Sequence, residues 1–172
     1  MRKAQLIARL MHERDQWELL LNYVGAGRMD IGGVTGAWSV KDILSHVMAC
    51  EEYLADRLTE IAEGRLLPPC KSQDELDTFL EDFGYPDFES SLMSEQSADD
   101  WVVRKFKYIP HKDLVEREIH AFDSILAGIN VLSEAQLNHG DLIRKIRKFT
   151  FEHYRHHAVE ISRRFKTPVK RS

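Results

Sequence analysis

The sequence predicts an all-α protein: a four-helix bundle with a long crossover between its second and third helices. Four segments carry apolar residues at the 3.6-residue spacing of an amphipathic helix, and the strict alternation typical of a half-buried strand is hardly present. The prolines lie between or after these segments, where they disturb a helix least. Because each apolar stripe must be buried against another, the four helices are expected to pack as one domain over residues 1–172.

The first two helices are predicted within residues 1–24 and 39–64. Glycines clustered between positions 25 and 36 end the first one. At the start of the second, the Ser39 hydroxyl can cap the backbone, and Asp42 three residues later completes a capping box. The apolar positions that define the two stripes include Leu6, Leu10, Trp17, Val24, Val40, Ile43, Val47, Leu54 and Leu58.

Residues 65–110 differ in character, because four prolines divide them into short pieces, as expected of a crossover. Ser72 and Glu75 form another capping-box signature and predict a short helix. The stretch from Ser97 to Asp100 is expected to open a second one. The four prolines are Pro68, Pro69, Pro86 and Pro110.

The third and fourth helices are predicted over residues 111–133 and 141–166. The third begins directly after Pro110, and the fourth ends before Pro168 and a short basic tail. Both keep a helical period of apolar residues along their whole length. These positions include Leu114, Ile119, Phe122, Ile125, Ile129, Leu142, Ile146, Phe149, Ile161 and Phe165.

Composition excludes several classes of function. A formal charge of -4 and a pI near 6.1 argue against nucleic acid or an anionic membrane as a partner. No apolar run approaches the roughly 20 residues that cross a bilayer, and charges interrupt the first residues too often for a secretory signal, so a cytoplasmic protein is expected. Cys50 and Cys70 form no CxxC pair, which supports neither a disulfide framework nor a thiolate zinc site, and Cys50 is interpreted as a small core residue.

The predicted fourth helix contains two histidines that point with its apolar stripe. At about 100° per residue, His153 and His157 lie near the centre of the stripe, and His156 lies at its margin. Imidazoles at i and i+4 can offer two nitrogen ligands to one zinc-like ion. The alternative is that both rings form hydrogen bonds inside the core or line a wet groove. Burying two polar rings without partners is costly, which favours the metal.

A third ligand would come from another helix. His46 in the second helix lies about 90° from the centre of that stripe, so geometry permits this residue without selecting it. Glu160 lies near the face of His153, where it could orient a ligand or act as a base. The alternative interpretation of Glu160 is a solvated residue or an ion-pair partner. Motifs of nucleotide binding, serine hydrolysis and zincin proteases are absent.

Two segments resemble motifs of the DinB-like superfamily, and most closely its ClbS/DfsB branch. They are GAWSVKDILSHVMACEEYL in the second helix and TFEHYRHHAVEI in the last. The resemblance in layout covers nearly the whole chain and implies a four-helix bundle with a divalent metal, zinc or nickel, held by three histidines. Carried over by position, these are His46, His153 and His157. The family often has glutamine where this chain has Glu160.

The resemblance implies an enzyme that acts on small electrophilic or thiol-conjugated molecules, as a hydrolase or a thiol-dependent transferase. Glu160 or Tyr154 would be its proton-transfer partner. Two alternatives stay open: a bundle that binds or sequesters a small molecule without turnover, and a hydrolase of the ClbS type that needs no metal. A homodimer is also plausible for a bundle of this size.

Overall fold

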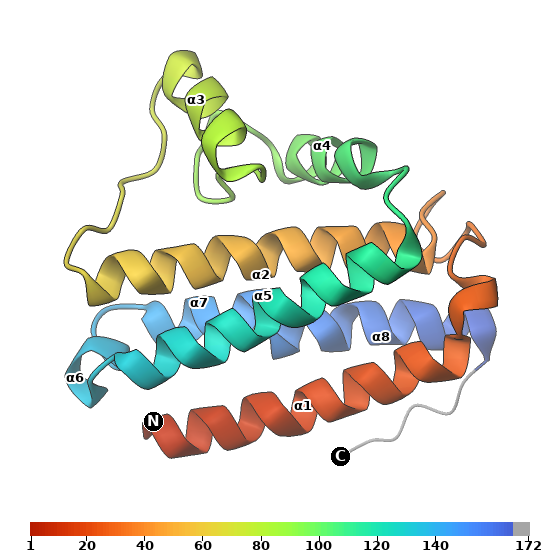
Figure 1. Ribbon diagram of the computed structural model, residues 1–172, viewed down its shortest axis with the longest axis horizontal. Coiled ribbons are helices and arrows are strands. Elements are labelled where there is room, and N and C mark those ends of the chain that lie inside the picture. The colour runs from red at the N-terminus through yellow and green to blue at the C-terminus, as the bar shows by residue number, and fades with distance from the viewer. Residues whose placement is uncertain (167–172) are drawn as a thin grey trace.

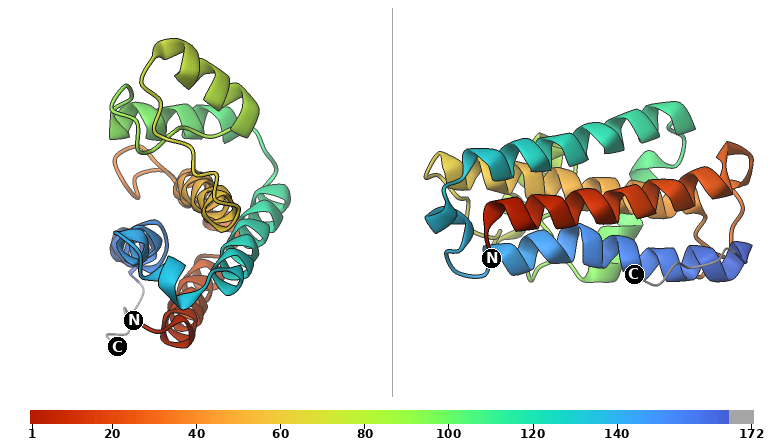
Figure 2. Two further views of the ribbon diagram at one scale, coloured as in Figure 1. Left: turned by 90° about the vertical axis from the view of Figure 1, so that its left-hand side faces the viewer. Right: turned by 90° about the horizontal axis from the view of Figure 1, so that it is seen from below.

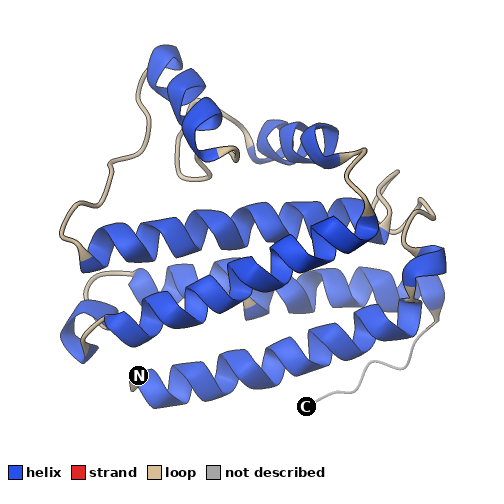
Figure 3. Cartoon of the chain, viewed as in Figure 1, coloured by secondary structure: helices blue, strands red, loops and turns tan. Residues whose placement is uncertain are grey.

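The computed structural model describes residues 1–166, and the ordered elements in this range are helices (Figure 3). Among these residues, β-type pairing is limited to one isolated bridge between Thr35 and Trp38. Within the same range, no helix combines the length and the apolar character needed to cross a membrane. The chain is therefore all-α over its described part, as the sequence predicts.

Four long helical segments lie side by side and form the bundle (Figure 1). They are α1 (Lys3–Val24), α2 (Val40–Ala62), α5 (His111–Val131) and the consecutive pair α7 (Leu142–Phe149) and α8 (Phe151–Phe165). Viewed along its length, the bundle has α2 between α5 and the α7–α8 segment, with α1 on the side away from the crossover (Figure 2). The most extensive helix pairing is that of α2 with α5.

The crossover carries two short helices, α3 (Gln73–Phe83) and α4 (Glu95–Phe106), which lie over the outer side of α2 (Figure 1). Of these two, α4 makes the broader contact with α2. A further short helix, α6 (Glu134–Leu137), precedes α7, and a 3-10 turn, η1 (Ala26–Arg28), follows α1. The helix α2 is consequently covered on most sides, and this explains its many buried residues.

Local capping signals agree with the structure at the start of α2 and in part within the crossover. The Asp42 amide donates to the Ser39 hydroxyl at 3.2 Å, and the Ser39 amide donates to the Asp42 carboxylate at 3.0 Å, which confirms the capping box. Ser72 caps α3 as predicted, although the Glu75 carboxylate accepts from Lys71 instead. The predicted second short helix is present as α4, but the prediction that Ser97 opens it is wrong, because it begins at Glu95. Ser94 caps α4, because its hydroxyl accepts from the Ser97 amide at 3.1 Å.

The predicted continuous fourth helix over residues 141–166 is divided at Thr150. The Thr150 hydroxyl donates to the Ile146 carbonyl at 2.5 Å, where a regular helix would use the Thr150 amide. That amide donates instead to the Arg147 carbonyl at 3.3 Å, and Thr150 has φ -124° and ψ -105°. The helical pattern resumes when Tyr154 donates to the Thr150 carbonyl at 2.9 Å. A side-chain donor has thus replaced a backbone donor, and α7 and α8 are separate helices.

A buried polar network joins the four parts of the bundle. The Arg14 guanidinium on α1 forms a bidentate ion pair with Glu118 on α5 and lies 3.4 Å from the Glu51 carboxylate on α2. The Tyr154 hydroxyl on α8 donates to Glu51 at 2.6 Å. Burial, followed by the negative charge of Glu118, raises the pKa of Glu51 well above its usual value. One cation therefore faces two carboxyl groups, and the raised pKa of Glu51 favours its neutral form, which limits their repulsion.

Candidate metal centre

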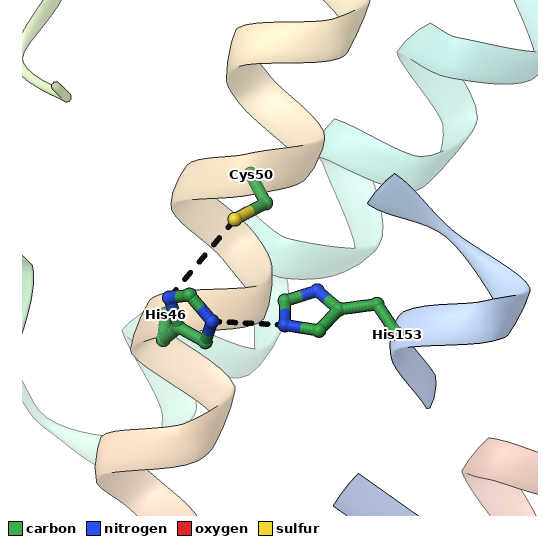
Figure 4. A group of neighbouring side chains, drawn as sticks. All are labelled: His46, Cys50 and His153. Carbon is green, nitrogen blue, oxygen red and sulfur yellow. Dashed lines mark hydrogen bonds between the residues drawn. The ribbon is translucent and has the colours of Figure 1, made fainter. Parts of the chain in front are cut away.

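The structure brings together the three histidines that the sequence and the resemblance single out. His46 extends from α2, and His153 and His157 extend from α8 one turn apart. The Nε2 atom of His153 lies 2.8 Å from Nε2 of His46 and 3.0 Å from Nε2 of His157. The three ring centroids lie 4.6, 4.7 and 5.5 Å from one another. Figure 4 shows His46 and His153 facing each other across the two helices.

Two of these rings are held from behind by carboxylates. Nδ1 of His46 lies 3.0 Å from Oδ1 of Asp99 on α4, and Nδ1 of His157 lies 3.0 Å from Oε1 of Glu160. The second oxygen of Glu160 accepts from the Thr35 hydroxyl. A carboxylate at Nδ1 favours a proton on that nitrogen and leaves the Nε2 lone pair for a metal. Both lone pairs therefore point toward the nitrogen of His153.

His153 tests whether the cluster fits a metal. Its Nδ1 is buried without a hydrogen-bond partner among the described residues. If Nδ1 carries the proton, a buried donor is unpaired and three lone pairs face one another. If Nε2 carries it, one donor must serve two acceptors, and the Nδ1 lone pair stays unpaired. Since no neutral tautomer satisfies the ring, the arrangement is costly unless a cation receives the three lone pairs.

The spacing of the nitrogens agrees with this requirement. Zinc–imidazole bonds of about 2.0–2.1 Å place neighbouring ligand nitrogens roughly 2.9–3.4 Å apart, the shorter value for octahedral and the longer for tetrahedral angles. The observed separations are 2.8 and 3.0 Å. Imidazole donors suit zinc, nickel and copper better than magnesium or calcium. The residues present thus fit a divalent transition metal.

The three rings differ in their affinity for protons. Burial lowers the pKa of His46, but the neighbouring Cys50 and Asp99 outweigh burial and raise this pKa to about 10. Burial and then the positive charge of His46 lower the pKa of His157 to about 4. Burial, His46 and His157 in turn lower the pKa of His153 well below its usual value. His153 and His157 are therefore held neutral, which is the form that binds a metal, whereas His46 carries a proton at neutral pH that a metal must displace from Nε2 before this ring can bind it.

Two residues at this centre were missed by the sequence analysis. Asp99 comes from the crossover, and no local pattern indicates that α4 will bring it to His46. Cys50 is a buried core residue, as predicted, but the sequence analysis did not indicate that its Sγ lies 4.0 Å from Nδ1 of His46 (Figure 4). Ligand atoms of His46, Cys50 and His153 all lie within 4.8 Å of one another, so this buried group could hold a metal ion. The i, i+4 spacing of His46 and Cys50 was the available signal.

The structure places Tyr154 away from the histidines. Its ring stacks on Trp17 with centroids 5.5 Å apart, and its hydroxyl is bonded to Glu51 inside the bundle. A proton-transfer role for Tyr154 at the metal centre does not agree with this position. His156 is exposed, as its place at the margin of the stripe predicts, and its Nε2 lies 3.3 Å from Glu160. With His157 and Glu160 it forms a second, more exposed group that could hold a cation.

A cavity of about 770 Å³ opens beside the histidines. Its walls come from the loop before α2, the crossover with α4, and the facing sides of α2, α7 and α8. The volume is in the range of about 300–1,000 Å³ that small-molecule sites occupy. Its aromatic and charged lining residues are Trp38, Phe88, Phe149, Asp87, Glu95, Asp99, Asp100, Glu152 and Lys148. The cluster is therefore accessible to a small molecule from one side.

Comparisons with known proteins add no relative. No protein-family model, curated protein or solved structure matches the chain. The resemblance to the DinB-like superfamily is therefore carried by the two sequence motifs alone, and the function must be argued from the histidine cluster and its cavity.

Proposed function

We propose that this protein is a metalloprotein with a DinB-like fold, in which His46, His153 and His157 bind one divalent ion, zinc or nickel. The observation that carries the proposal is the convergence of three Nε2 atoms, with adjacent separations of 2.8 and 3.0 Å. The carboxylates behind His46 and His157 support it, since they favour a proton on each Nδ1 and leave Nε2 of both rings facing His153. The order of elements, with α3 and α4 between the second and third long helices, agrees with the DinB-like layout.

We further propose that the centre acts on a small electrophilic molecule, as a hydrolase or as a thiol-dependent transferase. A bound divalent ion supplies a Lewis acid that lowers the pKa of a coordinated water or thiol. The chain itself supplies the cavity, whose aromatic walls hold an apolar part of the substrate. Glu160 is best assigned to orienting His157, because His156, His157 and Thr35 already occupy its two oxygens.

Metal analysis of protein purified without a histidine tag tests the proposal. About one equivalent of zinc or nickel is expected in the wild-type chain and little in a His153→Ala/His157→Ala variant. His120→Ala, at an exposed position of α5, is the matched control and should retain the metal. Absence of metal from the wild type, even after incubation with Zn²⁺ or Ni²⁺, would refute the proposal.

The size of the cavity also favours a second candidate, a bundle that binds a small molecule without turnover. A ligand that binds only the folded state raises the thermal midpoint, so screening by thermal shift and then testing each hit for product separates binding from catalysis. Activity that survives chelation and the loss of His153 and His157 would instead indicate a metal-independent hydrolase of the ClbS type.

A further inference from the structure

We propose that Cys50 supplies a thiolate as a fourth protein donor to the metal, so that the centre contains one sulfur and three nitrogen ligands. The inference builds on the proposed metal site and concerns a residue outside its three histidines. Its basis is a matched arrangement: α2 presents His46 and Cys50 one turn apart, and α8 presents His153 and His157 one turn apart. All four side chains line the same cavity.

The sulfur lies within reach of the centre. Cys50 Sγ belongs with His46 and His153 to a group whose ligand atoms are all within 4.8 Å, although its contact at 4.0 Å is with Nδ1 of His46, the nitrogen that faces Asp99 and not His153. Bonds of about 2.3 Å to sulfur and 2.0–2.1 Å to nitrogen place these atoms roughly 3.5 Å apart in a tetrahedral centre. The separations of up to 4.8 Å exceed this value by at most about 1.3 Å, so coordination requires Sγ to move from the Nδ1 side of His46 toward Nε2 by rotation about the Cα–Cβ bond of Cys50.

Cys50 also differs from the other cysteine of the chain. Within residues 1–166, the hydrogen bonding of the Cys50 sulfur is limited to its contact with His46. A metal at this sulfur would therefore compete with no other strong partner. Cys70 is also buried but lies in the crossover, where its amide donates to Asp87 at 2.8 Å. Cys70 takes part in neither metal-like group. It therefore offers a control of the same residue type at an unrelated position.

A thiolate changes what the centre can bind. Sulfur favours zinc, cobalt and nickel over magnesium and manganese, which prefer oxygen. Four protein donors also complete a tetrahedral shell, so water or substrate enters only if the shell expands or the sulfur dissociates. Cys50 would consequently set both the metal preference of the site and the ease with which a substrate reaches the ion.

Cobalt substitution provides the test. Metal-free protein titrated with Co²⁺ is expected to develop a near-ultraviolet sulfur-to-cobalt charge-transfer band. The band should disappear in Cys50→Ser and persist in Cys70→Ser, and Co²⁺ affinity should fall at least about tenfold in Cys50→Ser alone. The wild-type spectrum decides the question even if the Cys50 variant does not fold.

The outcomes separate the two proposals. Cobalt binding that needs His153 and His157 but produces no charge-transfer band would overturn the role of Cys50 and leave the histidine site standing. A band that persists in Cys50→Ser would equally exclude Cys50 as the donor. If Co²⁺ and Zn²⁺ fail to bind any form of the protein, both the histidine site and the role of Cys50 are wrong.

Discussion

The contact between Asp99 and His46 yields a quantitative prediction. Replacing Asp99 with alanine removes the acceptor that lies 3.0 Å from Nδ1 of His46 and leaves that ring free to turn or to change tautomer. Loss of a carboxylate behind a ligating histidine typically weakens metal binding by about 10–100-fold. The Asp99 side chain is 27% exposed, so water can partly replace it, and the lower part of this range is expected. The free-energy cost is therefore about 1.4 kcal/mol, which corresponds to a factor of ten.

The assay is a competition titration of Zn²⁺ between the protein and a fluorescent chelator. Asp99→Asn keeps an acceptor oxygen without the charge and should recover part of the affinity lost in Asp99→Ala. Asp100→Ala is the matched control, because Asp100 lines the same cavity without a recorded bond to a histidine. Affinity unchanged in Asp99→Ala, or an equal loss in Asp100→Ala, would refute the idea that Asp99 orients His46.

Three further predictions concern the scaffold and the second cysteine. Arg14→Met leaves the buried Glu118 carboxylate without its cation and should lower the free energy of unfolding, measured by urea titration, by about 3–5 kcal/mol. The control Lys112→Met, at an exposed ion pair, should change the free energy of unfolding by about 0.5 kcal/mol or less. Gly128→Ala places a Cβ 3.0 Å from Leu58 Cβ, where the overpacking cost of about 1–3 kcal/mol outweighs the gain of about 1 kcal/mol in helix propensity. The thermal midpoint should therefore fall, and a raised midpoint would contradict the close approach of α5 to α2. Burial and Asp87 raise the pKa of Cys70 from 9.0 to about 11. In a Cys50→Ser background, the rate at which iodoacetamide alkylates Cys70 should therefore rise with pH up to about pH 11. A rate that reaches its plateau near pH 9 would contradict the raised pKa.

Features of the fold that depend on local signals could be predicted from the sequence. The apolar stripes predicted the long helices because burial repeats with the helical period, and Ser39 with Asp42 marked the start of α2 because both partners lie within one turn. The division at Thr150 could not be predicted in this way. Threonine occurs in continuous helices too, and the apolar period runs on across the interruption.

The candidate site was predictable only where its residues share a helix. His153 and His157 are one turn apart, so their common direction follows from the period alone. His46 needed the family resemblance, because the angle between α2 and α8 is not encoded in either stripe. Asp99 was inaccessible for the same reason, since it reaches His46 only through the packing of α4 on α2. Tyr154, named with Glu160 as a proton-transfer partner, is next to His153 in the sequence but points into the bundle, because one residue turns the helix by about 100°.

That same turn connects the metal centre to the polar network of the bundle. Glu51 follows Cys50 on α2, and Tyr154 follows His153 on α8, so each ligand helix carries one network residue beside a metal-facing one. The Tyr154 hydroxyl donates to Glu51 at 2.6 Å, and Arg14 with Glu118 holds Glu51 from the other two helices. A buried ion pair that is linked to a third helix in this way is compatible with few helix arrangements, because a shift of the helices leaves a charge unpaired. We therefore infer that this network fixes the spacing of α2 and α8 at which the three nitrogens meet.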